Sequence, residues 1–143
     1  MKDDYLKYWR VVRYFITKKY NITQTDLEML LFLKSERYFT TKNFQTYHEV
    51  FPWDRNRFVR LRKNGWIVEF PKRKGSRQMY ELSNLAKSMI ANLYSKLNGE
   101  VFPESQSKNP LFATNVPYMH KVYRNMIKEI NETRRQEQRP SQK

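Results

Sequence analysis

The sequence predicts a mainly α-helical fold with one small antiparallel β-hairpin. Apolar residues recur at intervals of three and four along most of the 143-residue chain, which is the spacing of helices with one buried face. Two short β-favouring segments flank the turn "PKRKGSR", which is the pattern of a hairpin. A chain of this length is expected to form one hydrophobic core.

The first two predicted helices cover residues 3–19 and 23–36. Thr23 is suited to cap the second helix, and Asp26, three residues later, would complete a capping box. The first helix gathers its apolar residues on one face: Tyr5, Tyr8, Trp9, Val12, Phe15 and Ile16. The second helix does the same with Leu27, Leu30, Leu31 and Leu33.

Two shorter helices joined by a turn are predicted next. Thr41 is a capping residue for the third helix, which ends at Pro52. Asp54 can cap the fourth helix, residues 54–64, and Gly65 suits the left-handed conformation that ends a helix. The third helix is expected to direct three aromatic residues inward: Phe44, Tyr47 and Phe51.

The hairpin is predicted over residues 66–82, and its tip is the basic stretch 71–77. Ser83 then caps a fifth helix that ends near Gly99. The apolar face of this helix would be formed by Leu85, Ala86, Met89, Ile90, Leu93 and Leu97.

The C-terminal part of the chain is predicted to be an arm, a helix and a tail. Residues 100–117 contain three prolines and little periodicity, so we expect an irregular arm on the surface or on a partner. Residues 118–135 form a helix with Met119, Val122, Met126, Ile127 and Ile130 on one side. Residues 136–143 are expected to be a disordered basic tail. The order of elements is that of a winged helix-turn-helix, residues 1–99, with added N- and C-terminal helices.

The stretch "LRKNGWIVEFPKRKGSRQMYELSNLAKSMIANL" resembles the MarR-type winged helix-turn-helix regulators. In that family a recognition helix ends in Leu with Gly four residues later, as at Leu61 and Gly65, and a basic wing returns to a Leu–Ser step, as at Leu82 and Ser83. The resemblance covers Ile22 to Leu97 and implies a homodimeric, DNA-binding transcription regulator. The wing departs from the family pattern because Gly75 replaces an Asp that pairs with the wing arginine.

The charge of the chain favours a polyanionic partner. The formal net charge is +14 and the sequence pI is about 10.0, which makes nucleic acid the leading candidate. The low Gly count of 3, against 11 Asn and 15 Lys, is typical of an AT-rich genome such as that of a phage. No apolar run is long enough to span a membrane, so we expect a cytoplasmic protein bound to double-stranded DNA.

The fourth helix has a polar face suited to DNA. With Phe58, Leu61 and Gly65 inward, a rotation of 100° per residue places the other side chains outward. Asn56 suits adenine, Arg60 suits guanine, and Val59 suits a thymine methyl group. The predicted contact residues of this helix are Arg55, Asn56, Val59, Arg60 and Lys63.

The turn "PKRKGSR" would be the tip of the wing. A winged helix places this hairpin beside the recognition helix, against the sugar-phosphate backbone or the minor groove. The predicted wing contacts are Lys72, Arg73, Lys74 and Arg77. A solvated basic loop is the alternative explanation of these charges.

No enzymatic site, cofactor or metal site is predicted. The chain has no Cys, no Gly-rich phosphate loop and no nucleophile elbow. His48 and His120 lack partners at metal-ligand spacing, and Trp9, Trp53 and Trp66 are expected in the core or an interface.

Two functions compete. The first is a homodimeric transcription regulator whose terminal helices pair and whose recognition helices lie about one DNA turn apart, roughly 34–36 Å. The second is an architectural protein of a virion or nucleoid with little sequence specificity. The terminal helices could instead pack only within their own chain. The target sequence and any small-molecule effector are not specified by the sequence.

Overall fold

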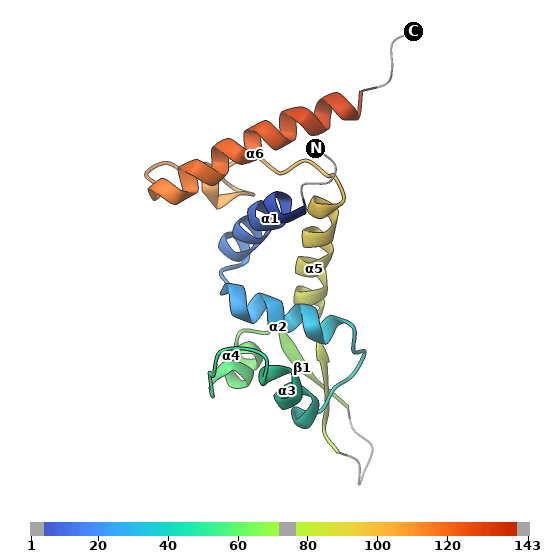
Figure 1. Ribbon diagram of the computed structural model, residues 1–143. Helices are drawn as coiled ribbons and strands as arrows, with labels where there is room; N and C mark the ends of the chain where they lie inside the picture. Colours follow the sequence, from blue (N-terminus) through green and yellow to red (C-terminus); the bar gives the residue numbers. More distant parts are fainter. Residues whose placement is uncertain (1–4, 72–76, 140–143) are drawn as a thin grey trace. The chain divides into compact units, whose positions relative to one another are not determined.

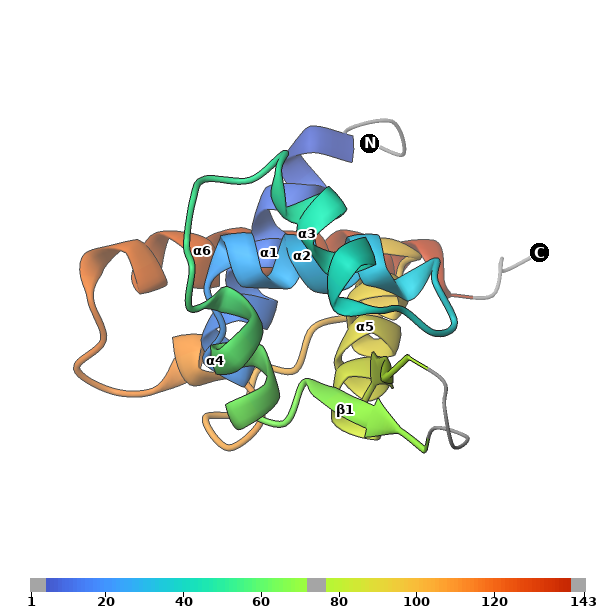
Figure 2. The ribbon, with the colours of Figure 1, turned by 90° about the horizontal axis from the view of Figure 1, so that it is seen from below.

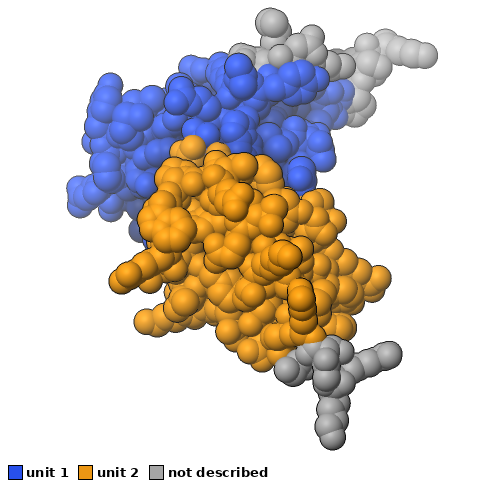
Figure 3. Space-filling model, turned by 60° about the horizontal axis from the view of Figure 1, so that its bottom comes forward, with its two compact units in different colours: residues 1–22, 92–143 blue, residues 23–91 orange. Residues whose placement is uncertain are grey.

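The computed structural model describes residues 5–71 and 77–139 and divides the chain into two compact units. Unit 1 comprises residues 1–22 and 92–143, and unit 2 comprises residues 23–91 (Figure 3). The described residues form six α-helices and one two-stranded antiparallel sheet, so the predicted mainly α-helical class with a small hairpin is confirmed. The units differ from the predicted division near residue 99, because the N-terminal helix groups with the C-terminal half of the chain.

Unit 1 is built on α1 (Tyr5–Tyr20), the end of α5 (Asn84–Leu97) and α6 (Tyr118–Glu137) (Figure 1). The core side of α1 consists of Val11, Val12, Phe15 and Ile16. The aromatic residues of its first turns were predicted to share this face, but Tyr5 is 72% exposed. The burial begins at Val11, because Val11, Val12, Phe15 and Ile16 are the aliphatic and Phe side chains that share one side of the helix.

The segment between α5 and α6 is largely irregular, as predicted, but three of its residues are buried in unit 1 and not on the surface. Phe102, Asn109 and Leu111 are buried, and η1 (Pro110–Phe112) contacts both α1 and α6. The Phe102 ring meets Phe15 edge to face at 5.4 Å. The prolines break the periodicity of the segment, but its few apolar side chains still reach the core.

Helix α6 continues to Glu137, two residues beyond its predicted end and into the predicted disordered tail. Its buried side includes Ile127 and Ile130 and also two polar residues, Asn131 and Arg134. Arg134 Nη1 donates to the Glu100 carbonyl at 2.6 Å, so one of the N–H groups of the buried guanidinium has a hydrogen-bond partner. Met119 was predicted on the core side but is 50% exposed.

Unit 2 begins with α2 (Gln24–Lys34) and α3 (Thr41–His48). Thr23 caps α2 as predicted, because its hydroxyl accepts a hydrogen bond from the Asp26 backbone N–H. The cap of α3 is Thr40 instead of the predicted Thr41, and it forms a full capping box with Asn43. Phe44 is buried as predicted, whereas Tyr47 and Phe51 are half-buried.

Helix α4 (Arg57–Lys63) begins three residues later than predicted. The Asp54 side chain accepts from the Asn56 backbone N–H at 3.0 Å, and this closes a turn ahead of the helix. Gly65 ends the helix with φ +82°, as expected for the left-handed residue. Figure 2 shows α4 leading directly into β1.

The hairpin consists of β1 (Ile67–Phe70) and β2 (Met79–Leu82), paired antiparallel from Ile67↔Leu82 to Phe70↔Met79. Phe39 adds an isolated bridge to Tyr80. Ser83 then caps α5 by accepting from the Ala86 N–H at 3.1 Å, as predicted.

The core side of α5 agrees with the predicted face, except that Leu85 is 47% exposed. None of the helices in the described part of the chain has the length and apolar character needed to cross a membrane.

Candidate nucleic-acid interface

The outer side of α4 and the turn before it carry most of the predicted contact residues. Arg55 and Asn56 lie in the turn, not on the helix as predicted, and both are exposed. Val59 is 63% exposed and Lys63 is exposed on the helix itself. The structure therefore brings four predicted contact residues to the surface around one short helix.

The inner side of α4 is held by an ion-pair cluster, Asp26, Asp54, Arg57 and Arg60. Arg60 Nε donates to Asp26 Oδ2 and Arg60 Nη2 donates to Asp26 Oδ1, both at 2.8 Å. Arg60 Nη2 also lies 2.8 Å from Asp54 Oδ2. Arg57 Nε donates to Asp26 Oδ1 at 3.1 Å, and both of these side chains are only 4% exposed.

This cluster gives Arg60 a different role from the predicted contact with guanine. Its hydrogen bonds to Asp26 and Asp54 raise the Arg60 pKa further, so the guanidinium stays charged, and it is paired with both carboxylates. The same Arg60 hydrogen bond, with one from the Asn56 backbone, lowers the pKa of Asp54. Arg60 therefore fixes α4 against α2 and the preceding turn.

The cluster also corrects the predicted capping box of α2. The box required the Asp26 carboxylate to turn back toward Thr23, but both of its oxygens accept from Arg57 and Arg60. Arg57 was not singled out from the sequence. A signal was present, because Asp26 falls on the same face as Leu30 and Leu33, and an acid on an apolar face indicates a buried pair.

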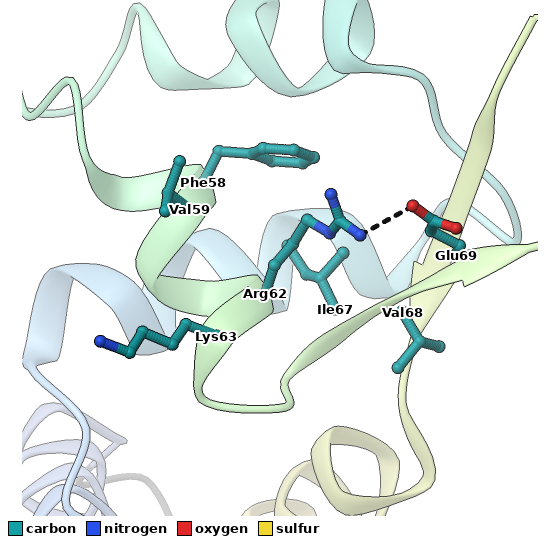
Figure 4. A pocket seen from close by; sticks show the side chains of 7 residues that line it. All are labelled: Phe58, Val59, Arg62, Lys63, Ile67, Val68 and Glu69. Atoms are coloured by element: carbon teal, nitrogen blue, oxygen red, sulfur yellow. Dashed lines mark hydrogen bonds and ion pairs between the residues drawn. The ribbon is translucent and has the colours of Figure 1, made fainter.

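A shallow groove runs between α4 and β1 (Figure 4). Phe58, Ile67 and Val68 give it an apolar lining. Arg62 reaches across to Glu69 at 2.8 Å, while Lys63 points away from β1 (Figure 4). The Arg62–Glu69 pair is more than one third exposed on both sides, so it adds little stability.

The predicted wing is described only at its base. Lys72, Arg73 and Lys74 lie outside the described residues. Arg77, next to β2, is exposed, and no ion pair is recorded for it within residues 5–71 and 77–139. Its guanidinium therefore faces solvent from the hairpin.

Comparison of the chain with family models, curated proteins and solved structures gave no match. The functional assignment therefore depends on the residues of this chain alone. The predicted MarR-type resemblance remains a prediction.

The histidines and tryptophans fall in contrasting environments. His120 Nδ1 lies 2.8 Å from the Tyr14 hydroxyl, and His48 is buried. No group of three or more His, Asp and Glu side chains that could hold a metal ion occurs among the described residues.

Trp66 is buried as predicted, but Trp53 is 79% exposed. Trp53 belongs to the turn before α4, and its ring lies 5.6 Å from the His48 ring between centroids while most of its surface is in solvent.

Proposed function

We propose that unit 2 is a winged helix-turn-helix domain and that the chain is a double-stranded-DNA-binding transcriptional regulator. The order α2, α3, turn, α4, β1, β2 supports this, because such a domain follows its recognition helix with a hairpin. In this proposal α4 enters the major groove and the wing, residues 71–77, lies on the backbone or the minor groove.

The observation that carries the proposal is the unopposed positive charge around α4. The acids near this helix, Asp26, Asp54 and Glu69, are each already paired with an arginine. Arg55 and Lys63 are exposed and no ion pair is recorded for them within the described part of the chain. The surface around α4 therefore attracts phosphate without competition from a neighbouring carboxylate.

Each exposed side chain has a proposed role. Asn56, whose side chain makes no helix-capping hydrogen bond, can form the two-point amide contact that suits adenine. Val59 can meet a thymine methyl group, and Lys63 and Arg55 can neutralise phosphates. Arg77 extends these phosphate contacts along the wing. Arg60 acts indirectly, because its pairs with Asp26 and Asp54 set the position of α4.

We also propose that the chain forms a homodimer through unit 1. Exposed apolar and aromatic side chains occur at the beginnings of both terminal helices, namely Tyr5 and Leu6 on α1 and Tyr118 and Met119 on α6. A two-fold dimer would present two copies of α4 to a pseudo-palindromic site. The buried faces of the same helices are already covered within unit 1, so a partner would contact these exposed residues.

An architectural DNA-binding function is the second candidate, and the composition of α1 favours it. This helix of 16 residues carries five Lys and Arg and no acid. Like charges three or four residues apart weaken a helix by a few tenths of a kcal/mol per pair, so a polyanion near α1 would relieve that repulsion. The positive charge of α1, in unit 1, adds to the charge around α4 in unit 2. Charge on both units supports binding that does not depend on base sequence.

A competition titration separates these functions. Genomic fragments selected by binding compete with random duplex for the protein, and fluorescence anisotropy reports the bound fraction. A regulator prefers the selected fragments by about 10³-fold or more, whereas a ratio near one supports the architectural function. Failure to bind any duplex at low salt would reject both.

A further inference from the structure

Trp53 is held out in solvent by a fixed turn. The side chain is 79% exposed, although the backbone around it is tied at two points. Arg57 Nη1 donates to the Pro52 carbonyl at 3.1 Å, and Asp54 accepts from the Asn56 N–H. A large aromatic side chain on a fixed, exposed turn is a candidate contact for a binding partner.

A small pocket of about 230 Å³ lies beside Trp53. Its lining includes Phe44, Gln45 and His48 of α3 together with Trp53, Asp54 and Arg55 of the turn. The pocket is smaller than the usual site for a drug-sized ligand, which starts at about 300 Å³. Its size therefore suits one small planar group.

His48 forms part of the wall of this pocket. The residue is 5% exposed, and its Nε2 atom is buried without a hydrogen-bond partner among the described residues. Its ring lies 5.6 Å from the Trp53 ring, centroid to centroid, at an interplanar angle of 32°. The His48 ring thus packs against Trp53, and most of the Trp53 surface remains exposed for a ligand.

The chemistry of the pocket selects a neutral ligand with hydrogen-bonding edges. Burial, and then the charge of Arg57, lower the pKa of His48. The imidazole is therefore neutral near pH 7 and adds no charge to the wall of the pocket. Gln45 adds an amide, which offers both a donor and an acceptor. Nucleobases combine a flat face for stacking with such edges.

We propose that Trp53 and the pocket beside it bind a single unpaired nucleobase. The base stacks on Trp53 and presents its edge to Gln45, while Arg55 meets the adjoining phosphate. This inference rests on the proposed function, because the base belongs to the DNA bound by α4. It adds a preference for DNA that is bulged or opened beside the site.

The test compares three labelled duplexes of one sequence. The first is fully paired, the second carries one bulged thymidine, and the third carries an abasic bulge at the same position. The wild-type protein should bind the thymidine bulge about fivefold to a hundredfold more tightly than the abasic bulge. Trp53→Ala should abolish this difference and leave affinity for the paired duplex nearly unchanged.

Two controls keep the test specific. Tyr94→Ala removes another partly exposed aromatic residue, 40% exposed on α5, and should keep the bulge preference. The intrinsic fluorescence of a Trp9→Phe variant should be quenched by the thymidine bulge more than by the abasic bulge. Equal affinities for both bulges would overturn this inference and leave the proposed function standing. Loss of affinity for all three duplexes on Trp53→Ala would also overturn it, by making Trp53 a backbone contact. Failure of the wild-type protein to bind any duplex would reject the proposed function itself.

Discussion

Arg60 and Asp26 form a two-point contact, in which Nε and Nη2 of the arginine each lie 2.8 Å from a different carboxylate oxygen. Arg57 reaches the same carboxylate at 3.1 Å. Three charged groups thus share one largely buried position between α2 and α4, and the orientation of α4 depends on all of them.

Removal of Asp26 should strongly destabilise unit 2. Asp26→Ala leaves the buried Arg57 without a counter-charge, which costs about 3–5 kcal/mol for a buried pair. Chemical unfolding followed by circular dichroism measures the loss. The double variant Asp26→Leu with Arg57→Met should recover much of it, because no unpaired buried charge remains. An unchanged unfolding midpoint for Asp26→Ala would show that the cluster does not hold α4.

Asn56 and Arg60 should have separable effects on DNA binding. Asn56→Ala should cost about 1–3 kcal/mol on a preferred site and little on a scrambled duplex, with thermal stability unchanged. Arg60→Ala should lower thermal stability and weaken both duplexes alike, because it displaces the whole helix. Fluorescence anisotropy titrations on the preferred and scrambled duplexes measure the affinity of each variant. If Asn56→Ala weakens both equally, α4 does not read bases through Asn56.

The salt dependence of DNA binding should be steep, with a log–log slope beyond about −5 if six or more phosphates are neutralised. Arg77→Ala should flatten the slope by about one unit without changing thermal stability, because Arg77 has no recorded ion pair within the described residues. Arg135→Ala is a control, since that arginine is paired with Glu104 at 2.8 Å. A slope that Arg77→Ala leaves unchanged would exclude this residue from the phosphate contacts.

The proposed homodimer should depend on the exposed residues of the terminal helices. Leu6→Glu combined with Met119→Glu should convert the dimer into a monomer in sedimentation velocity at tens of micromolar, because the charges would be buried in the interface. Leu85→Glu changes an equally apolar exposed residue of unit 2 and should leave the dimer intact. A monomeric wild-type protein would reject the homodimer. Deletion of α6 is a poor test, since Ile127 and Ile130 belong to the core of unit 1.

Stability should fall when the pH is lowered from about 7 to 5. Burial lowers the pKa of both His48 and His120, with further contributions from Arg57 and Lys18 respectively. Below the unfolded pKa of about 6.5, the unfolded chain binds protons that the folded chain does not, so the free energy of unfolding decreases with falling pH. His48→Gln should flatten this dependence in chemical unfolding across the pH range. A stability that rises on acidification would contradict it.

The helices were predictable because their signals are local. The Thr23 cap, the Gly65 stop and the Ser83 cap each depend on residues within one turn, and all three are found as predicted. The segment 100–117 was not predictable in the same way. Its Phe102 and Leu111 have no periodic neighbours, and only the tertiary structure shows that they are buried.

The prediction of the DNA-contact residues on α4 met a similar difficulty. A helical rotation places Arg60 outward, and its side chain is indeed partly exposed, but the rotation cannot reveal the carboxylates of Asp26 and Asp54 that lie within its reach. Long arginine side chains are placed by their partners more than by their backbone position. The exposed positions of Asn56, Val59 and Lys63 needed no distant partner and were therefore easier to predict.

The side-chain amide of Asn131 both accepts from the Phe102 N–H at 2.7 Å and donates to the Phe102 carbonyl at 2.9 Å. Asn131 is also the first residue of the triplet "NET", an acceptor sequence for N-linked glycosylation. The residue is completely buried, so a glycan attached there during secretion would prevent Phe102 from docking. Production through a eukaryotic secretory pathway should therefore yield misfolded protein unless Thr133→Ala removes the acceptor sequence, which leaves Asn131 and its two hydrogen bonds to Phe102 in place.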